Sequence, residues 1–202
     1  MTTAVFFALE GTLLTRTDSR EAVVRTALDE TLGAAPDALV TAYFEAFAAR
    51  ADALDPEPHR AGMAAVAAQA DGNPTIDDLL SALRAADADA MRVPEGAHDA
   101  LATLGTDAHL GVLTNGDRAW TLDRIAAHDL PIQTVVTAAE AGARKPDPAP
   151  FELARDRVAA DEYVLVGDDY ERDVEGARAA GFVPIHYEES GPNFWKTLDA
   201  LA

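Results

Sequence analysis

An unbroken apolar run near the start of the chain limits the folds that are open to it. Residues 4–9 are all apolar and do not alternate with polar residues, which predicts a strand covered on both faces. Such strands form the centre of parallel sheets that carry helices on both sides. The run ends in Glu10-Gly11-Thr12, and ligands of open α/β sheets bind at the carboxyl ends of strands. We therefore expect a central strand at residues 4–9 with a site directly after it.

The rest of the chain divides into a helical stretch and a stretch where strands and helices alternate. Apolar residues recur at helical spacing in four segments between residues 17 and 92, with cap-like sequences at 18–21 and 75–78. Further on, strands are predicted at 109–114, 134–137, 163–166 and 183–186, and helices at 97–104, 117–128, 148–158, 171–180 and within 191–202. This order predicts an α/β fold with a doubly wound parallel sheet from residues 1–16 and 93–202, and an all-helical domain inserted at residues 17–92.

The composition narrows the range of partners and locations. Acidic residues number 35 against 16 basic ones, which gives a net charge of −19. A field of this sign repels nucleic acid and anionic membranes, so we expect neither as a partner. It is also typical of halophilic proteins adapted to a salt-rich cytoplasm. The sequence contains no cysteine, no signal-like segment and no apolar run near the roughly 18 residues of a membrane span, so we expect a cytoplasmic protein. The oligomeric state cannot be derived from these features.

Polar residues follow two of the later predicted strands. Thr114-Asn115-Gly116 ends one of them, although such a sequence is also an ordinary turn. Asp168 and Asp169 follow another strand, and Asp173 comes one helical turn later. Carboxylates crowded at a strand end repel one another and need a cation, and hard oxygen ligands suit Mg²⁺. The alternative is that the aspartates cap the next helix, for which one aspartate would be enough.

Lys145 is one of only two lysines in the chain, the other being Lys196. It lies directly before Pro146, which restricts the backbone at that point. A chain that has nearly dispensed with lysine keeps this one between a predicted strand and a predicted helix. The alternative interpretation is a surface lysine ahead of a helix, but the scarcity of lysine favours a functional role.

These stretches, in this order, resemble the four motifs of the haloacid dehalogenase (HAD) superfamily. The resemblance covers the predicted α/β core, and the helical insertion resembles the cap domain of that family. It implies a Rossmann-like core and a phosphatase-like hydrolase that acts on a small phosphorylated metabolite with Mg²⁺. By the same resemblance, Thr114, Asn115 and Lys145 bind the phosphoryl group. The implied catalytic residues are Glu10 and Lys145, and the implied metal ligands are Glu10, Asp168, Asp169 and Asp173.

The first motif departs from the family pattern at the two positions that perform the chemistry. In the family an aspartate attacks phosphorus and ligates Mg²⁺, and a second aspartate serves as acid and base. This chain has Ala8 at the first position and Glu10 at the second. Loss of a nucleophile from a catalytic unit costs on the order of 10⁶ in kcat. From the sequence, Glu10 could reach the vacated metal position, act as a general base towards water, or have no role.

Two hypotheses from different classes follow from this departure. The first is a hydrolase that cleaves phosphate esters weakly or by altered chemistry. The second is a non-catalytic relative, a pseudoenzyme, that binds a phosphorylated metabolite or a protein partner through the same pocket. The sequence leaves open whether Ala8 is natural or was introduced to trap an active enzyme. Phosphate release from an aryl phosphate with added Mg²⁺ separates the two hypotheses, because the second forbids it.

Overall fold

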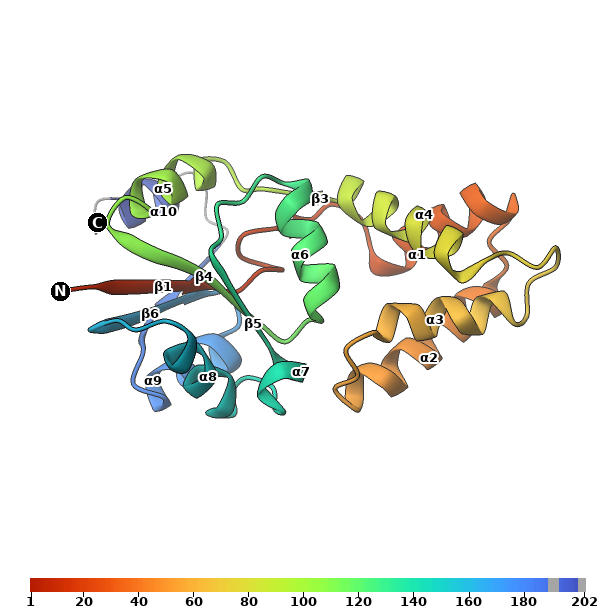
Figure 1. Cartoon of the computed structure of the whole chain (residues 1–202). Coiled ribbons are helices and arrows are strands. Elements are labelled where there is room, and N and C mark those ends of the chain that lie inside the picture. The colour runs from red at the N-terminus through yellow and green to blue at the C-terminus, as the bar shows by residue number, and fades with distance from the viewer. Residues whose placement is uncertain (189–192, 200–202) are drawn as a thin grey trace. The chain divides into compact units, whose positions relative to one another are not determined.

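The computed structural model describes residues 1–188 and 193–199, and a parallel five-stranded sheet forms the centre of one of its two compact units (Figure 1). The strand order is β5-β4-β1-β6-β7, which confirms the predicted doubly wound α/β fold. The strands are β1 (Thr3–Phe7), β4 (Ala108–Thr114), β5 (Thr134–Thr137), β6 (Glu162–Gly167) and β7 (Val183–His186). In register, Phe7 of β1 is level with Val112 of β4 and Val166 of β6. The segments that follow these three strands therefore emerge side by side at one edge of the sheet.

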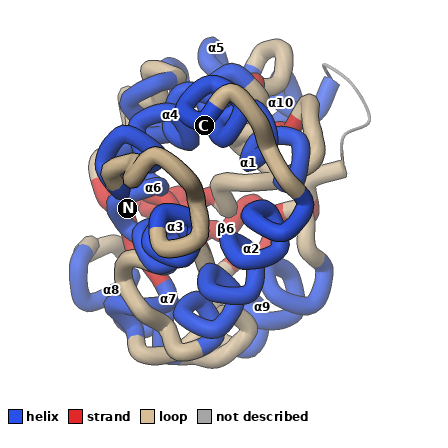
Figure 2. The backbone as a smooth tube through the Cα atoms, turned by 90° about the vertical axis from the view of Figure 1, so that its right-hand side faces the viewer, coloured by secondary structure: helices blue, strands red, loops and turns tan. Residues whose placement is uncertain are grey.

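The apolar residues of β1 alternate between two buried layers, as a strand covered on both faces requires. Phe6 lies 6.2 Å from the ring of Phe182, which in turn contacts Phe151 of α8 (Ala149–Arg157) at 5.4 Å. On the other face, Phe7 stacks on Trp195 of α10 (Asn193–Asp199) at 6.2 Å. Figures 1 and 2 show α5 (Ala97–Leu104) with α10 on one face of the sheet, and α8 with α9 (Gly176–Ala179) on the other.

Residues Arg16–Met91 form a second compact unit, separate from the unit of Met1–Thr15 and Arg92–Ala202. Its helices are α1 (Arg20–Leu32), α2 (Asp37–Asp52), α3 (Pro58–Ala67) and α4 (Ile76–Asp89). The Ser19 and Thr75 side chains accept hydrogen bonds from the amides of Ala22 and Asp78, so the cap-like sequences start α1 and α4. Residues 17–90, all of which the structure describes, contain no strand. Two short strands that the sequence did not predict, β2 (Thr15–Arg16) and β3 (Met91–Arg92), pair at the two boundaries.

The core helices differ from the expectation in two places. The helix expected at 171–180 is divided into the π-helix η1 (Tyr170–Glu175) and α9. A short helix that was not predicted, α7 (Ala138–Ala141), follows β5 directly. α6 (Arg118–Ala127) lies within its expected range. The expected tail helix corresponds to α10 within 193–199, and the remainder of that range lies outside the described residues.

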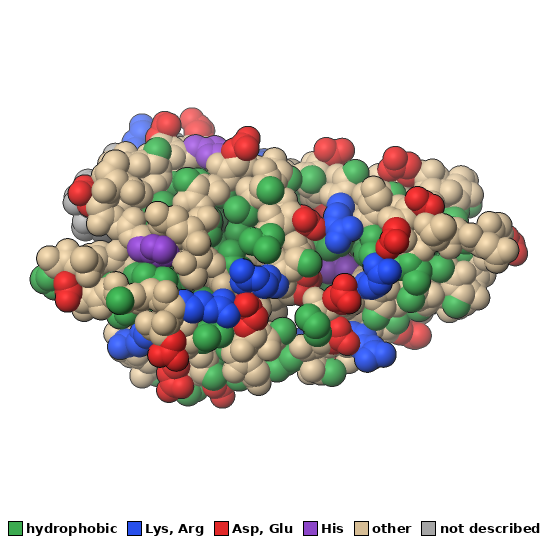
Figure 3. Space-filling view, in the orientation of Figure 1, with side chains coloured by type: hydrophobic (Ala, Val, Ile, Leu, Met, Phe, Trp, Pro, Cys, Tyr) green, Lys and Arg blue, Asp and Glu red, His purple; other side chains and the backbone are tan. Residues whose placement is uncertain are grey.

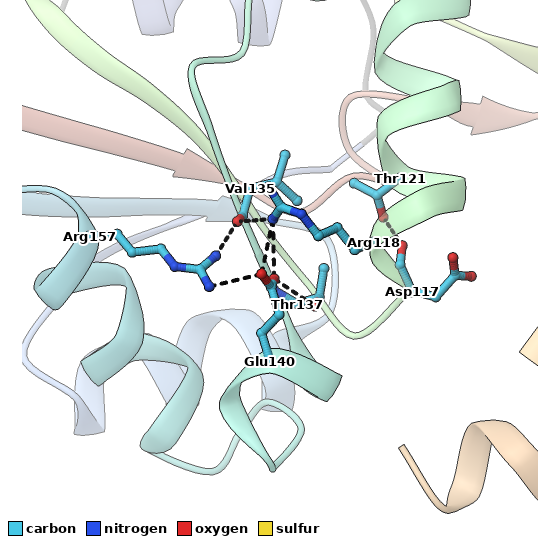
Figure 4. Close-up of polar contacts among 7 residues, drawn as sticks. All are labelled: Asp117, Arg118, Thr121, Val135, Thr137, Glu140 and Arg157. Atoms are coloured by element: carbon cyan, nitrogen blue, oxygen red, sulfur yellow. Dashed lines mark hydrogen bonds and ion pairs between the residues drawn. The ribbon is translucent and has the colours of Figure 1, made fainter. Parts of the chain in front are cut away.

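Glu140 fixes α7 to the outer strand β5 (Figure 4). Its Oε2 accepts hydrogen bonds from the amide and the hydroxyl of Thr137, at 3.1 and 2.8 Å. Its Oε1 is bound by Arg118 at 3.1 Å and by Arg157 at 2.8 Å. Both arginines also donate to the backbone carbonyl of Val135. This cluster anchors the segment that leads from β5 towards Lys145.

We expect Glu140→Gln to destabilise the protein at neutral pH by about 1 to 2 kcal/mol, because charge-assisted hydrogen bonds are lost. Burial alone would raise the pKa of Glu140, but hydrogen bonds from Arg157 and Thr137 outweigh it and lower the pKa below 4.5. A carboxyl group whose pKa is lowered by folding stabilises the protein when the pH is above its unfolded-state pKa. This stabilisation is lost as the pH falls through the folded-state pKa. Urea unfolding should therefore show the stability difference between the two proteins shrinking as the pH falls below the unfolded-state pKa of about 4.3.

The control is Glu21→Gln, which removes an exposed carboxylate that pairs with Arg25 four residues further along α1. Its effect on the free energy of unfolding should stay within about 0.5 kcal/mol at pH 7 and at pH 4. A Glu140→Gln deficit that is the same at pH 7 and pH 4 would contradict the electrostatic explanation.

Figure 3 shows Asp and Glu side chains spread over the visible face rather than gathered into one patch. Within the described residues, no helix is long and apolar enough to cross a membrane.

Candidate active site

The turn after β1 packs directly against the loop after β6. The Thr12 hydroxyl donates a hydrogen bond to Oδ1 of Asp168 at 2.9 Å. Gly11 has a φ of 89°, a left-handed conformation that favours glycine. A Cβ atom at position 11 would also collide with the Asp168 carboxylate. Glycine is therefore required here both for the backbone conformation and for the close approach of the two segments.

The segment after β4 holds the backbone of Lys145. Asn115 Oδ1 accepts from the Lys145 amide at 2.8 Å, and Asn115 Nδ2 donates to the Lys145 carbonyl at 3.1 Å. Nearby, the Thr114 hydroxyl accepts from the Gly116 amide at 3.0 Å. Asn115 thus contributes by orienting Lys145, a role that the sequence pattern did not specify.

Lys145 is buried, with 5% of its surface exposed, and its Nζ lies 2.5 Å from Oδ1 of Asp173. Burial lowers the pKa of Lys145, and the Asp173 carboxylate opposes that shift. Asp173 is buried as well, and its Oδ2 accepts from the Asp169 amide at 3.1 Å. Gly167 permits this arrangement, since a Cβ atom there would collide with the Asp173 side chain. The buried charges of Lys145 and Asp173 therefore neutralise each other close to the carboxyl end of β6.

The neighbouring aspartates have different surroundings. Asp169 caps η1 by accepting from the Arg172 amide at 2.8 Å, and its Oδ2 pairs with the Arg172 guanidinium at 2.5 Å. These hydrogen bonds lower the pKa of Asp169. Asp168 is exposed, and within the described part of the chain its carboxylate forms no ion pair. Asp168 is therefore the carboxylate that remains available to a ligand.

Glu10 has a partner that the sequence did not reveal. Arg124 of α6 reaches Glu10 Oε2 with its Nη1 at 3.2 Å, and both side chains are partly buried. Ala8 is buried directly after β1, where its amide donates to the carbonyl of Val166. The first motif therefore presents a methyl group and a carboxylate that is already paired. No motif marks Arg124, because it lies within an amphipathic helix where arginine usually faces solvent.

The predicted four-carboxylate metal site is not formed in this arrangement. Over residues 1–188 and 193–199 no three His, Cys, Asp or Glu side chains are grouped so that they could hold a metal ion. Each of Glu10, Asp169 and Asp173 is paired with an arginine or a lysine in this structure, so the site in which all three join Asp168 around one cation stays a prediction. The donor set left for a cation is Asp168. This still fits Mg²⁺, which keeps several waters and is often held by one or two carboxylates plus the phosphate of a substrate.

A family model described as haloacid dehalogenase-like hydrolase matches residues 7–185. The chain therefore belongs to this family of HAD-superfamily hydrolases, whose members generally use Mg²⁺. None of the curated protein sequences matches the chain.

Solved structures of related fold include enzymes of different specificity. A 2-haloacid dehalogenase from Pseudomonas syringae pv. Tomato DC3000 is 24% identical, with a TM-score of 0.68 over 95% of this chain and 89% of that chain. A HAD phosphatase from Thermococcus onnurineus is 23% identical, with a TM-score of 0.62 over 95% of this chain and 88% of its own. The magnesium-bound HAD-hydrolase YfnB from Bacillus subtilis is 16% identical, with a TM-score of 0.63 over 98% of both chains. At these identities the likeness establishes the fold and not the substrate.

Proposed function

We propose that this family member binds a small phosphorylated metabolite at the carboxyl edge of the sheet and has lost most or all catalysis through an aspartyl phosphate. The proposal depends on one observation. Asn115 and Asp173 still hold Lys145 in place, whereas Ala8 occupies the position of the attacking carboxylate. A buried ammonium paired with a buried carboxylate, on a residue whose backbone Asn115 holds by two hydrogen bonds, is costly to maintain, which favours a role in binding. A methyl group cannot attack phosphorus.

Mg²⁺ belongs to the proposal as a helper in phosphate binding. Asp168 would hold it together with water and an oxygen of the phosphoryl group. The cation would neutralise the charge of the phosphoryl group next to the exposed Asp168 carboxylate. Glu10 would join it only by leaving Arg124.

A second candidate function is slow hydrolysis by direct attack of water, with Glu10 as the general base. A carboxylate at the end of the first motif favours it, since general bases raise rates by roughly 10² to 10⁴. The contact of Glu10 Oε2 with Arg124 opposes it, because one carboxylate oxygen is already engaged by a cation. We therefore place this candidate second.

The test measures thermal unfolding with orthophosphate and with phosphate monoesters, with and without Mg²⁺, alongside phosphate release. At a ligand concentration 100 times Kd, binding to the native state should raise Tm by about 5 to 10 °C. Asp168→Asn should abolish the contribution of Mg²⁺, and Thr114→Val should weaken phosphate binding. No Tm shift with any phosphate compound would refute the binding site. Release of phosphate by the parent chain at ordinary enzymatic rates, about 1 to 10³ per second, would refute the loss of catalysis.

A further inference from the structure

An exposed aromatic side chain lies beside the proposed phosphate site. Tyr170 is the first residue of η1 and directly follows Asp168 and Asp169. Tyr170 is one of the few large hydrophobic residues that are exposed within the described part of the chain, with 55% of its surface accessible to solvent. The ring therefore offers an open face within two residues of the carboxylate that remains available to a ligand.

His186 holds this ring in a defined orientation. The two rings meet edge to face, with centroids 5.6 Å apart and an angle of 84° between their planes. His186 ends β7 level with Gly167 of β6, and its Nε2 lies 3.1 Å from the backbone carbonyl of Asp168. Because a carbonyl only accepts hydrogen bonds, Nε2 carries the proton in this contact. Tyr170 is thus linked, through one histidine, to the same loop that presents Asp168.

A single exposed apolar side chain is ordinary on a protein surface and needs no explanation by itself. Two features distinguish Tyr170 from that case. The ring contacts, edge to face, a neighbour that is itself hydrogen-bonded to the backbone, which favours one orientation of the ring before binding. It also directly follows Asp168 and Asp169, so it stands on the same loop as the carboxylate of the proposed phosphate site.

We infer that the ligand is a phosphate monoester whose organic part contains a flat aromatic ring, and that this ring stacks on Tyr170. The chemical class covers aryl phosphates and nucleoside monophosphates, which share a π-face next to a phosphate. The inference rests on the proposed function, because the phosphate must bind at the edge of the sheet. Tyr170 adds selectivity for the organic group, and Lys145, Thr114 and Asp168 act on the phosphate.

The test compares two esters of similar size that differ in aromatic character, phenyl phosphate and cyclohexyl phosphate, by titration calorimetry with Mg²⁺. The parent chain should bind phenyl phosphate about fivefold to tenfold more tightly. Tyr170→Ala should remove this preference and leave the affinity for cyclohexyl phosphate and orthophosphate unchanged. Tyr170→Phe should keep the preference, because it keeps the ring. Adenosine 5′-monophosphate against ribose 5-phosphate then distinguishes a nucleobase from a small aryl group.

Val183→Ala is the matched control, since Val183 is 46% exposed and lies at the opposite end of the strand that carries His186. It should change neither affinity. Equal affinities of the two esters for the parent chain, or a preference that survives in Tyr170→Ala, would overturn the inference while orthophosphate binding still supports the proposed function. If orthophosphate and both esters all fail to bind, the proposed function fails and the inference fails with it.

Discussion

The double variant Ala8→Asp, Glu10→Asp should release phosphate from phosphate esters at least a hundredfold faster than the parent chain when Mg²⁺ is present. Ala8 is buried directly after a central strand and its amide is hydrogen-bonded to Val166, so an aspartate there would be held on a rigid segment. Its carboxylate would restore a nucleophile, which attacks phosphorus while the alcohol leaves, and water would then hydrolyse the acyl phosphate. The charge is tolerable only if Lys145 and Mg²⁺ are placed to neutralise it.

The second substitution follows from the contact between Glu10 and Arg124. Aspartate at position 10 is one methylene shorter, which draws the carboxylate away from the arginine and returns it to the length that the family uses for its acid and base. The double variant should therefore exceed Ala8→Asp alone by the size of a general acid/base contribution, roughly 10² to 10⁴ at most.

Ala8→Asn, Glu10→Asp is the control for this experiment, because asparagine has the shape of aspartate and cannot attack as a carboxylate. It should remain at the rate of the parent chain. If the folded Ala8→Asp, Glu10→Asp variant releases no more phosphate than the parent, then the pocket has diverged beyond its first motif, and binding without catalysis becomes the better account.

The fold could be predicted because its elements depend on local patterns. The uninterrupted apolar run at 4–9 predicted a strand covered on both faces. The strand spans Thr3–Phe7, ending two residues earlier than predicted, and Phe6 and Phe7 pack into opposite layers. The strands at 134–137 and 183–186 and the helix at 97–104 have the predicted bounds. The pair β2 and β3 was missed because each strand has two residues and exists only through its partner, 75 or more positions away. Such pairing leaves no periodic signal in either segment.

The candidate site shows a different division between what sequence predicts and what it leaves open. The fold gathers residues of the motifs at the carboxyl ends of the central strands, in two connected groups. Thr12 is hydrogen-bonded to Asp168, and Asn115 and Asp173 both contact Lys145. Sequence could not assign partners to the carboxylates. A carboxylate is satisfied equally well by a metal ion or by an arginine, and only the geometry shows that Arg124 and Arg172 take Glu10 and Asp169.

Removing Asp173 should produce the largest loss of stability among these site residues. Asp173→Ala leaves the Lys145 ammonium buried without its counter-ion, and breaking a buried pair in this way costs about 3 to 5 kcal/mol. Chemical denaturation monitored by tryptophan fluorescence measures the loss. Glu188→Ala is the comparison, because it removes an exposed partner of His186 in the same unit and should cost less than about 1 kcal/mol.

A second variant separates the stability of the pair from its function. Lys145→Met, Asp173→Leu replaces both charges by apolar groups, and such replacements of buried ion pairs are often neutral or stabilising. Here about 1 to 3 kcal/mol should still be lost, since the Asp169 amide loses its acceptor on Asp173. This variant should nevertheless bind no phosphate, because the ammonium is gone. A double variant that is as unstable as Asp173→Ala would show that the unpaired charge is not the cause. Undiminished phosphate binding in a folded double variant would show that Lys145 does not bind the phosphoryl group.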